Sequence, residues 1–141
     1  MRGFTLIELL VVIAILVMLA AAFPIALDRT LPGRRVAVTA QNLVSAVRDA
    51  EAQSLLHGRP VILQMRDGGL LNSEKVAVTF PARTRVALVD VDGRALESIV
   101  AYPDGSVSAA RFEISERQHS RSVIISGTTG RVSLRVGASA P

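Results

Sequence analysis

The sequence predicts an α+β fold in which a long N-terminal hydrophobic helix is followed by a second helix and an antiparallel, β-rich head. Three observations predict this order. An uncharged run of 19 residues, Leu9–Leu27, lies near the start, and an amphipathic pattern covers Val38–Leu56. After Val61, short runs rich in Val and Ile are separated by Gly, Asp and Pro, which is typical of antiparallel strands. The 141 residues fit a single domain.

The first element is the apolar run. Half of the residues are hydrophobic but only 4% are aromatic. Counted from Phe4, the run spans residues 4–27, about 36 Å as a helix, which exceeds the roughly 30 Å of a bilayer's hydrocarbon core. We therefore expect a transmembrane helix over residues 4–27. The alternative is a cleaved secretory signal peptide, because Ala20–Ala22 resembles a cleavage site, but the length of the run favours a retained segment.

A break and a second helix are expected next. Pro32 and Gly33 form a helix-breaking pair, so residues 28–35 are interpreted as a break or stem linker. Beyond it, a 4-3-4 spacing of small and apolar side chains predicts a helix over Val38–Leu56 that packs against a sheet. Gly58 and Pro60 then end the helix. The stripe residues are Leu43, Val47, Ala50 and Ser54.

The strands belong to a head that we place at residues 36–141. Each predicted run is bounded by turn-forming residues such as Asp67-Gly68-Gly69, Asp92-Gly93 and Asp104-Gly105. The predicted strands are Val61–Met65, Val76–Phe80, Arg85–Val91, Ile99–Tyr102, Phe112–Ser115, Val123–Ser126 and Arg131–Val136.

The composition argues against an enzyme, and we expect no cofactor or metal. The chain has no Cys, and its two histidines, His57 and His119, are far apart in sequence. Asp90-Val-Asp92-Gly93 resembles the start of a calcium loop, but Arg94 and Ala101 occupy positions that require oxygen ligands. We interpret this segment as a tight hairpin turn.

Glu8 is the one charge inside the apolar N-terminal region. A carboxylate there costs a few kcal/mol unless it is paired or lies at the membrane interface. The next 19 residues supply no cation. We therefore expect a cationic partner on a neighbouring chain, and an amine created by cleavage between Gly3 and Phe4 would satisfy this requirement.

These N-terminal residues, Arg2-Gly3-Phe4-Thr5-Leu6-Ile7-Glu8, resemble the class III signal of type IV pilins and type II secretion pseudopilins. The resemblance implies that residues 1–3 form a leader, removed by the prepilin peptidase between Gly3 and Phe4. It implies N-methylation of Phe4 and an assembly salt bridge from Glu8 to the Phe4 amine of an adjacent subunit. The expected fold is accordingly pilin-like.

The head resembles the GspH/FimT family of minor pseudopilins. The matching segments are the helix-to-strand junction around Gly58-Arg-Pro-Val61 and two turn motifs, Tyr102–Ser108 and Ser126–Val132. The resemblance implies a minor pseudopilin near the tip of the periplasmic pseudopilus of a type II secretion system. It implies a single pass of the inner membrane with the head in the periplasm. The implied partners are other pseudopilins, the prepilin peptidase and methyltransferase, the inner-membrane assembly platform, and lipid around residues 4–27.

The basic residues leave two alternatives open. Arginine provides 15 of the 16 cationic side chains, and the formal net charge is +4. Arg131 and Arg135 are candidate anion contacts in a FimT-like minor pilin that binds DNA during uptake. Gly130-Arg131-Val132-Ser133 departs from the Gly-Arg-x-Arg motif of that group, because Arg135 falls two residues late. A third alternative is a membrane-tethered domain without a filament role, in which Glu8 would be dispensable.

Overall fold

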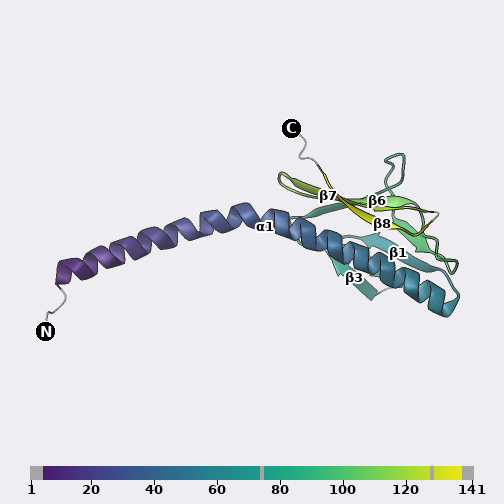
Figure 1. The fold of residues 1–141 in the computed structure, drawn as a ribbon, viewed down its shortest axis with the longest axis horizontal. Helices are drawn as coiled ribbons and strands as arrows, with labels where there is room; N and C mark the ends of the chain where they lie inside the picture. Colours follow the sequence, from purple (N-terminus) through teal and green to yellow (C-terminus); the bar gives the residue numbers. More distant parts are fainter. Residues whose placement is uncertain (1–4, 74, 128, 138–141) are drawn as a thin grey trace. The chain divides into compact units, whose positions relative to one another are not determined.

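A computed structural model describes residues 5–73, 75–127 and 129–137 of the chain, with residues 21–30 described by their backbone alone. The order of elements is one helix followed by eight strands (Figure 1). Contacts divide the chain into two compact units, residues 1–31 and residues 32–141. The α+β class predicted from the sequence is confirmed.

Helix α1 (Leu6–His57) contains 52 residues and includes both segments that the sequence predicts as helical. Residues 28–35, expected to form a break or linker, are helical instead. A proline inside a helix removes one backbone hydrogen bond, a loss that packing can offset. Pro32 is buried within its own unit. The helix itself is continuous at this point. Only the contacts change there, because the boundary between the two contact units lies between Leu31 and Pro32.

The C-terminal part of α1 follows the predicted pattern. All four residues of the predicted stripe are completely buried, whereas Arg48 and Asp49 are exposed. The helix ends at His57, and Gly58 adopts a left-handed conformation with φ of 60°. Glycine adopts this conformation without steric cost, so the predicted C-terminal stop is confirmed.

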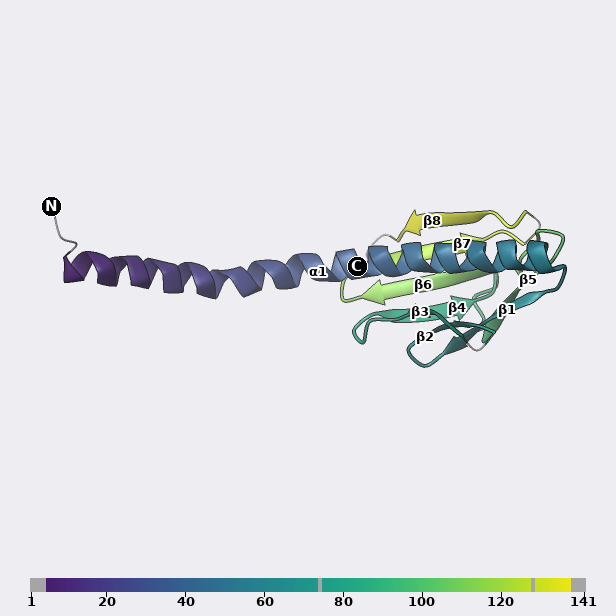
Figure 2. The same ribbon diagram turned by 90° about the horizontal axis from the view of Figure 1, so that it is seen from below.

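The strands form two antiparallel sheets of four strands each (Figure 2). The first sheet has the order β3-β2-β1-β5, and the second has the order β4-β6-β7-β8. The first contains β1 (Val61–Arg66), β2 (Gly69–Asn72), β3 (Lys75–Thr79) and β5 (Ser98–Ala101). The second contains β4 (Arg85–Val89), β6 (Ala110–Glu116), β7 (His119–Ile125) and β8 (Val132–Val136).

Strand β2 is the element that the sequence analysis missed. From the sequence, Gly69 is expected in a turn and no strand is predicted between Met65 and Val76, but Gly69–Asn72 pair with β1 in a hairpin in which Arg66 faces Gly69. The intervening Asp67-Gly68 is a two-residue turn with Gly68 at φ 88°. An Asp-Gly pair between apolar runs is a hairpin signal, and Leu70-Leu71 supplies the second run. The remaining strands lie within a few residues of their predicted bounds.

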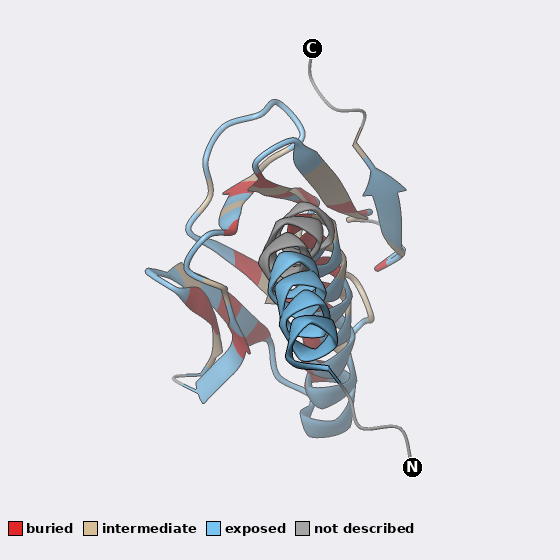
Figure 3. Ribbon diagram, turned by 90° about the vertical axis from the view of Figure 1, so that its left-hand side faces the viewer, coloured by how far each residue is buried: buried red, intermediate tan, exposed pale blue. Residues whose placement is uncertain are grey.

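The hydrophobic core joins α1 to both sheets. Its largest fully buried side chains include Leu43 from α1, Leu63 and Leu70 from the first sheet, and Phe112 and Ile114 from the second. Figure 3 shows buried stretches in strands of both sheets. The head is therefore one packed unit, built on the helical stripe that the sequence predicts.

Candidate functional site: the N-terminal helix and the basic strand

The start of α1 is fixed by backbone hydrogen bonds to Thr5. The Thr5 carbonyl accepts hydrogen bonds from the N–H groups of Glu8 at 3.0 Å and Leu9 at 3.2 Å. Thr5 therefore precedes the first helical turn, and Glu8 lies within that turn. The predicted cleavage position between Gly3 and Phe4, and the methylation of Phe4, lie outside the described residues.

The side chain of Glu8 is exposed, and within the described part of the chain no ion pair involves it. Its carboxylate lies near the positive end of the helix dipole, which favours a negative charge. Thr5 and Glu8 also have the Thr-x-x-Glu spacing of a capping box, a local role that the sequence analysis did not weigh. A salt bridge from Glu8 to a neighbouring subunit stays a prediction.

Hydrophobic side chains are exposed around the whole circumference of the first turns of α1. Every residue from Thr5 to Ala20 is exposed, with values of 82% for Leu6, 52% for Ile13 and 77% for Met18. A helix that is apolar all round requires lipid or other chains to cover it. Among the described residues, however, no helix is both long enough and apolar enough to cross a bilayer. Residue 4 and side chains 21–27 of the predicted span lie outside what the structure describes.

A comparison with protein families identifies a known motif at the N-terminus of the chain. Residues 1–23 match the family model of the prokaryotic N-terminal methylation motif. The chain carries a type IV pilin-like N-terminus. This motif implies processing by a prepilin peptidase and assembly with other pilins, as the resemblance predicts. No curated protein and no solved structure matches the chain, so the comparisons do not distinguish a GspH from a FimT assignment.

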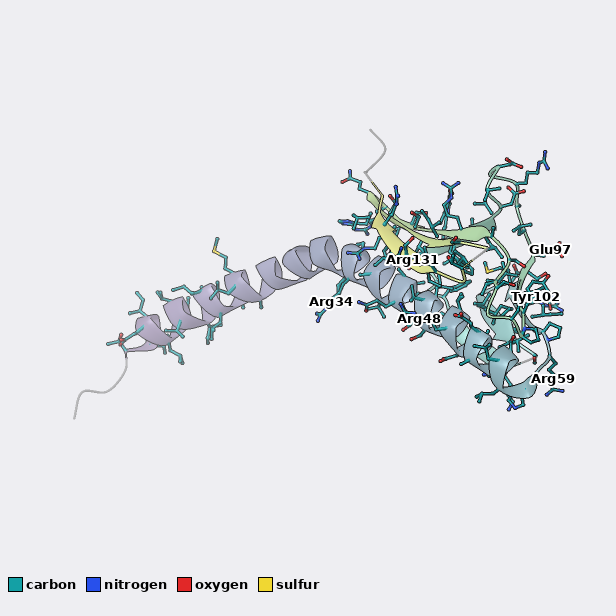
Figure 4. All side chains as sticks on the ribbon, turned by 45° about the vertical axis from the view of Figure 1, so that its right-hand side comes forward. Arg34, Arg48, Arg59, Glu97, Tyr102 and Arg131 are labelled. Atoms are coloured by element: carbon teal, nitrogen blue, oxygen red, sulfur yellow. The ribbon has the colours of Figure 1, made fainter. Side chains whose placement is uncertain are left out.

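The two candidate anion contacts belong to the last strand and the residue before it, and Figure 4 labels the first of them, Arg131. Arg131 directly precedes β8, and its carbonyl accepts a hydrogen bond from the Ser126 N–H at 3.0 Å. Arg135 lies within β8 opposite Ser122 of β7. Both arginines are exposed, and an even spacing on an extended chain places them on the same face.

The face of the second sheet that carries Arg135 is polar. Ser122 also lies opposite Glu113 of β6, which places Glu113 on this face too. Glu113 forms a loose ion pair with Arg111 at 3.7 Å between Nη1 and Oε1. Arg85 of β4 lies opposite Ser115 and adds a further cation to the same face. The structure thus groups arginines that are up to fifty residues apart in sequence.

A buried ion pair in the head was not predicted. Arg35 Nη1 lies 3.0 Å from Glu116 Oε1, and the Thr84 hydroxyl donates to Glu116 Oε2 at 2.8 Å. The Glu116 side chain is only 2% exposed, whereas Arg35 keeps 37% exposure. Residues so distant in sequence give no local signal of pairing. Arg35 therefore joins α1 to the ends of β4 and β6.

The two acidic turns are local hydrogen-bonded structures. Asp90 Oδ1 accepts from the N–H groups of Asp92 at 2.9 Å and Arg94 at 2.8 Å, which confirms the tight turn. Asp104 Oδ1 accepts from the Ser106 hydroxyl at 2.6 Å and the Ser106 N–H at 2.9 Å. These two bonds lower the pKa of Asp104 below its ordinary value. The described residues contain no cluster of three or more His, Asp or Glu side chains able to hold a metal.

Proposed function

We propose that this chain is a minor pseudopilin of a type II secretion system, a structural subunit without enzymatic activity. It is incorporated near the tip of the periplasmic pseudopilus and helps to export folded proteins across the outer membrane. The observation that carries the proposal is the methylation motif over residues 1–23. Residues 1–3 would be removed by the prepilin peptidase, and Phe4 would be methylated.

The exposed apolar side chains at the start of α1 and the charge of Glu8 support assembly of the chain into a filament. Before assembly, residues 4–27 would anchor the chain in the inner membrane, with the head in the periplasm. In the filament, the exposed apolar side chains of α1 would pack against other pseudopilin helices. The Glu8 carboxylate would then neutralise the Phe4 amine of an adjacent subunit, which removes the cost of an unpaired charge in an apolar environment.

Intact-mass analysis tests the first step of this proposal. The chain is produced with and without a prepilin peptidase, and its mass is compared with that of the full sequence. We expect a mature chain beginning at N-methylated Phe4 only when the peptidase is present. An uncut chain, or a chain cut after Ala22, would contradict the proposal and favour an ordinary anchor or a signal peptide.

A FimT-like DNA-binding pilin is the second candidate, because Arg131 and Arg135 are both exposed on the face of the second sheet that also carries Arg111. Arginine side chains arranged in this way can contact phosphates, and such binding weakens as salt rises. In this alternative, the change of Arg131 and Arg135 to Ala abolishes salt-dependent DNA binding by the full chain. Unchanged binding in that variant, or no binding by the original chain, would leave the secretion role as the better account.

A further inference from the structure

A groove with a volume of about 560 Å³ lies between the C-terminal half of α1 and strand β3. We name it the α1–β3 groove. Its helical wall is formed mainly by polar side chains at intervals of three or four residues, which places them on one face of α1. Its other wall is formed by β3 together with Asn72 and Ser73. The helical residues are Asn42, Ser45, Ala46, Asp49, Gln53 and His57, and β3 contributes Lys75, Val76 and Ala77.

Strand β3 is an edge strand. In the first sheet it pairs with β2 on one side, and no described strand pairs with it on the other. An exposed edge presents backbone N–H and C=O groups that can pair with an added strand. Val76 is 65% exposed on this strand and provides an apolar contact for a cross-strand neighbour. A free sheet edge beside a helix is the arrangement that binds extended peptides by strand addition.

The polar groups at one end of the groove are incompletely satisfied. Asn72 Nδ2 donates to Gln53 Oε1 at 3.2 Å, but Asn72 Oδ1 is buried without a hydrogen-bond partner among the described residues. An unsatisfied buried acceptor is uncommon and costs free energy. The adjacent Ser73 has φ of 46°, a conformation that non-glycine residues rarely adopt. Such features concentrate at binding sites.

The charges around the groove favour an acidic occupant. Arg59, just beyond the end of α1 (Figure 4), and Lys75 both line it. Neither forms an ion pair within the described residues, where the ion pairs are Arg35–Glu116 and Arg111–Glu113. Asp49 is the single carboxylate in the described lining. Among the described lining residues, the two cations therefore outnumber the one carboxylate and can pair with carboxylates of an incoming chain. Glu74, between Ser73 and Lys75 in sequence, lies outside the described residues.

We infer that the α1–β3 groove binds an extended acidic segment of a partner protein, which adds as a strand to the free edge of β3. Backbone pairing with β3 would supply affinity, and Arg59 and Lys75 would select carboxylate side chains. This role goes beyond incorporation into a filament, because it uses a surface of the head remote in sequence from the methylation motif.

Selection from a displayed peptide library tests the inference. The full chain in detergent micelles is used to select peptides of about eight residues, the length of an ordinary strand. We expect enrichment of peptides with Asp or Glu among β-branched residues, and slower hydrogen exchange at residues 75–79 when such a peptide is bound. Enrichment of basic or neutral peptides, or no enrichment, would overturn the inference.

Two matched pairs of variants locate the binding. The charge reversals Arg59→Glu with Lys75→Glu are compared with Arg83→Glu and Arg94→Glu, two exposed arginines outside the groove whose reversal changes the net charge equally. Ala77→Trp, which fills the groove, is compared with Ala87→Trp on the exposed edge strand β4. We expect the groove variants to weaken binding of a selected acidic peptide about tenfold or more and the controls to leave it unchanged. Equal effects within each pair would overturn the inference. Circular dichroism of each variant verifies that the head is folded.

Discussion

At the residue scale, the head depends on polar contacts that satisfy buried groups. The carboxylate of Glu116 is the clearest case, because burial removes it from water while Arg35 and Thr84 contact its two oxygens. Its neighbour Arg34 is exposed and lies outside this contact (Figure 4). Two adjacent arginines, identical in chemistry, thus differ in role because only one faces the sheet.

We predict that Arg35→Met destabilises the head by about 2 kcal/mol, because it removes the cation that pairs with the buried Glu116 carboxylate. The loss is smaller than for a fully buried pair, since Arg35 itself is partly exposed. Arg34→Met should change the free energy of unfolding by less than about 0.5 kcal/mol. Denaturant unfolding of the full chain in micelles measures both values. Equal effects of the two variants would contradict the structural role of the Arg35–Glu116 pair.

Asp104 gives a prediction about pH. Its pKa is lowered by hydrogen bonds from Ser106, so its contribution to stability is present above the unfolded-state pKa and is lost as pH falls through the folded-state pKa. Ser106→Ala removes the hydroxyl donor and should raise the pKa of Asp104 towards its ordinary value. NMR titration of the carboxyl carbon measures the change. Ser108→Ala is the control, because the Ser108 hydroxyl contacts the backbone of Val100 instead. A pKa unaffected by Ser106→Ala would disprove the assignment.

At the scale of elements, α1 shows how a local breaker is overridden. Gly33 does not end the helix but lies against the ring of His119 at the start of β7. An added Cβ would be only 3.3 Å from His119 Cε1 and Nδ1. The close approach of the His119 ring therefore opposes a larger side chain at residue 33, although glycine is unfavourable for an isolated helix.

A double-mutant cycle tests this explanation. In a His119→Ala background, Gly33→Ala should stabilise the head by up to about 1 kcal/mol, because only the gain in helix propensity remains. In the original chain the same substitution should gain less or destabilise, since the ring must shift. The difference between the two backgrounds, measured by thermal unfolding, is the coupling energy. A coupling energy near zero would show that the ring does not restrict residue 33.

At the scale of the whole molecule, the two units differ in whether their apolar side chains are buried. Residues 32–141 bury their apolar side chains in one core, whereas residues 5–20 leave theirs exposed. The apolar side chains of residues 5–20 therefore require lipid or other protein chains to cover them. A change confined to the first unit is expected to affect assembly without affecting the stability of the head.

Glu8→Ala tests this separation. We predict that the variant is still cleaved by the prepilin peptidase and unfolds at the same temperature, but that its incorporation into filaments falls at least about tenfold. Incorporation is measured by the amount of the chain in sheared filament fractions. Glu51→Ala in the head is a control for removal of one carboxylate. Normal incorporation of Glu8→Ala would favour a membrane-tethered domain without a filament role.

The sequence alone determined the features that depend on local chemistry. An uninterrupted apolar run, the burial stripe through Leu43 and Val47, and the Gly and Asp turns can each be predicted from neighbouring residues, because helix periodicity and turn conformation are local properties. The methylation motif is equally local, since it lies in one continuous stretch. From these patterns the α+β class, most strands and the assembly hypothesis followed.

Only the tertiary structure decided which distant segments meet. The eight strands form two sheets, and Gly69–Asn72 is one of these strands. Arg35 pairs with Glu116, and α1 remains helical through Pro32 and Gly33. Strand order and buried ion pairs depend on contacts between residues far apart in sequence, for which local propensity carries little information. The same physical reason explains why the α1–β3 groove, formed by a helix and a sheet edge, became visible only in the folded chain.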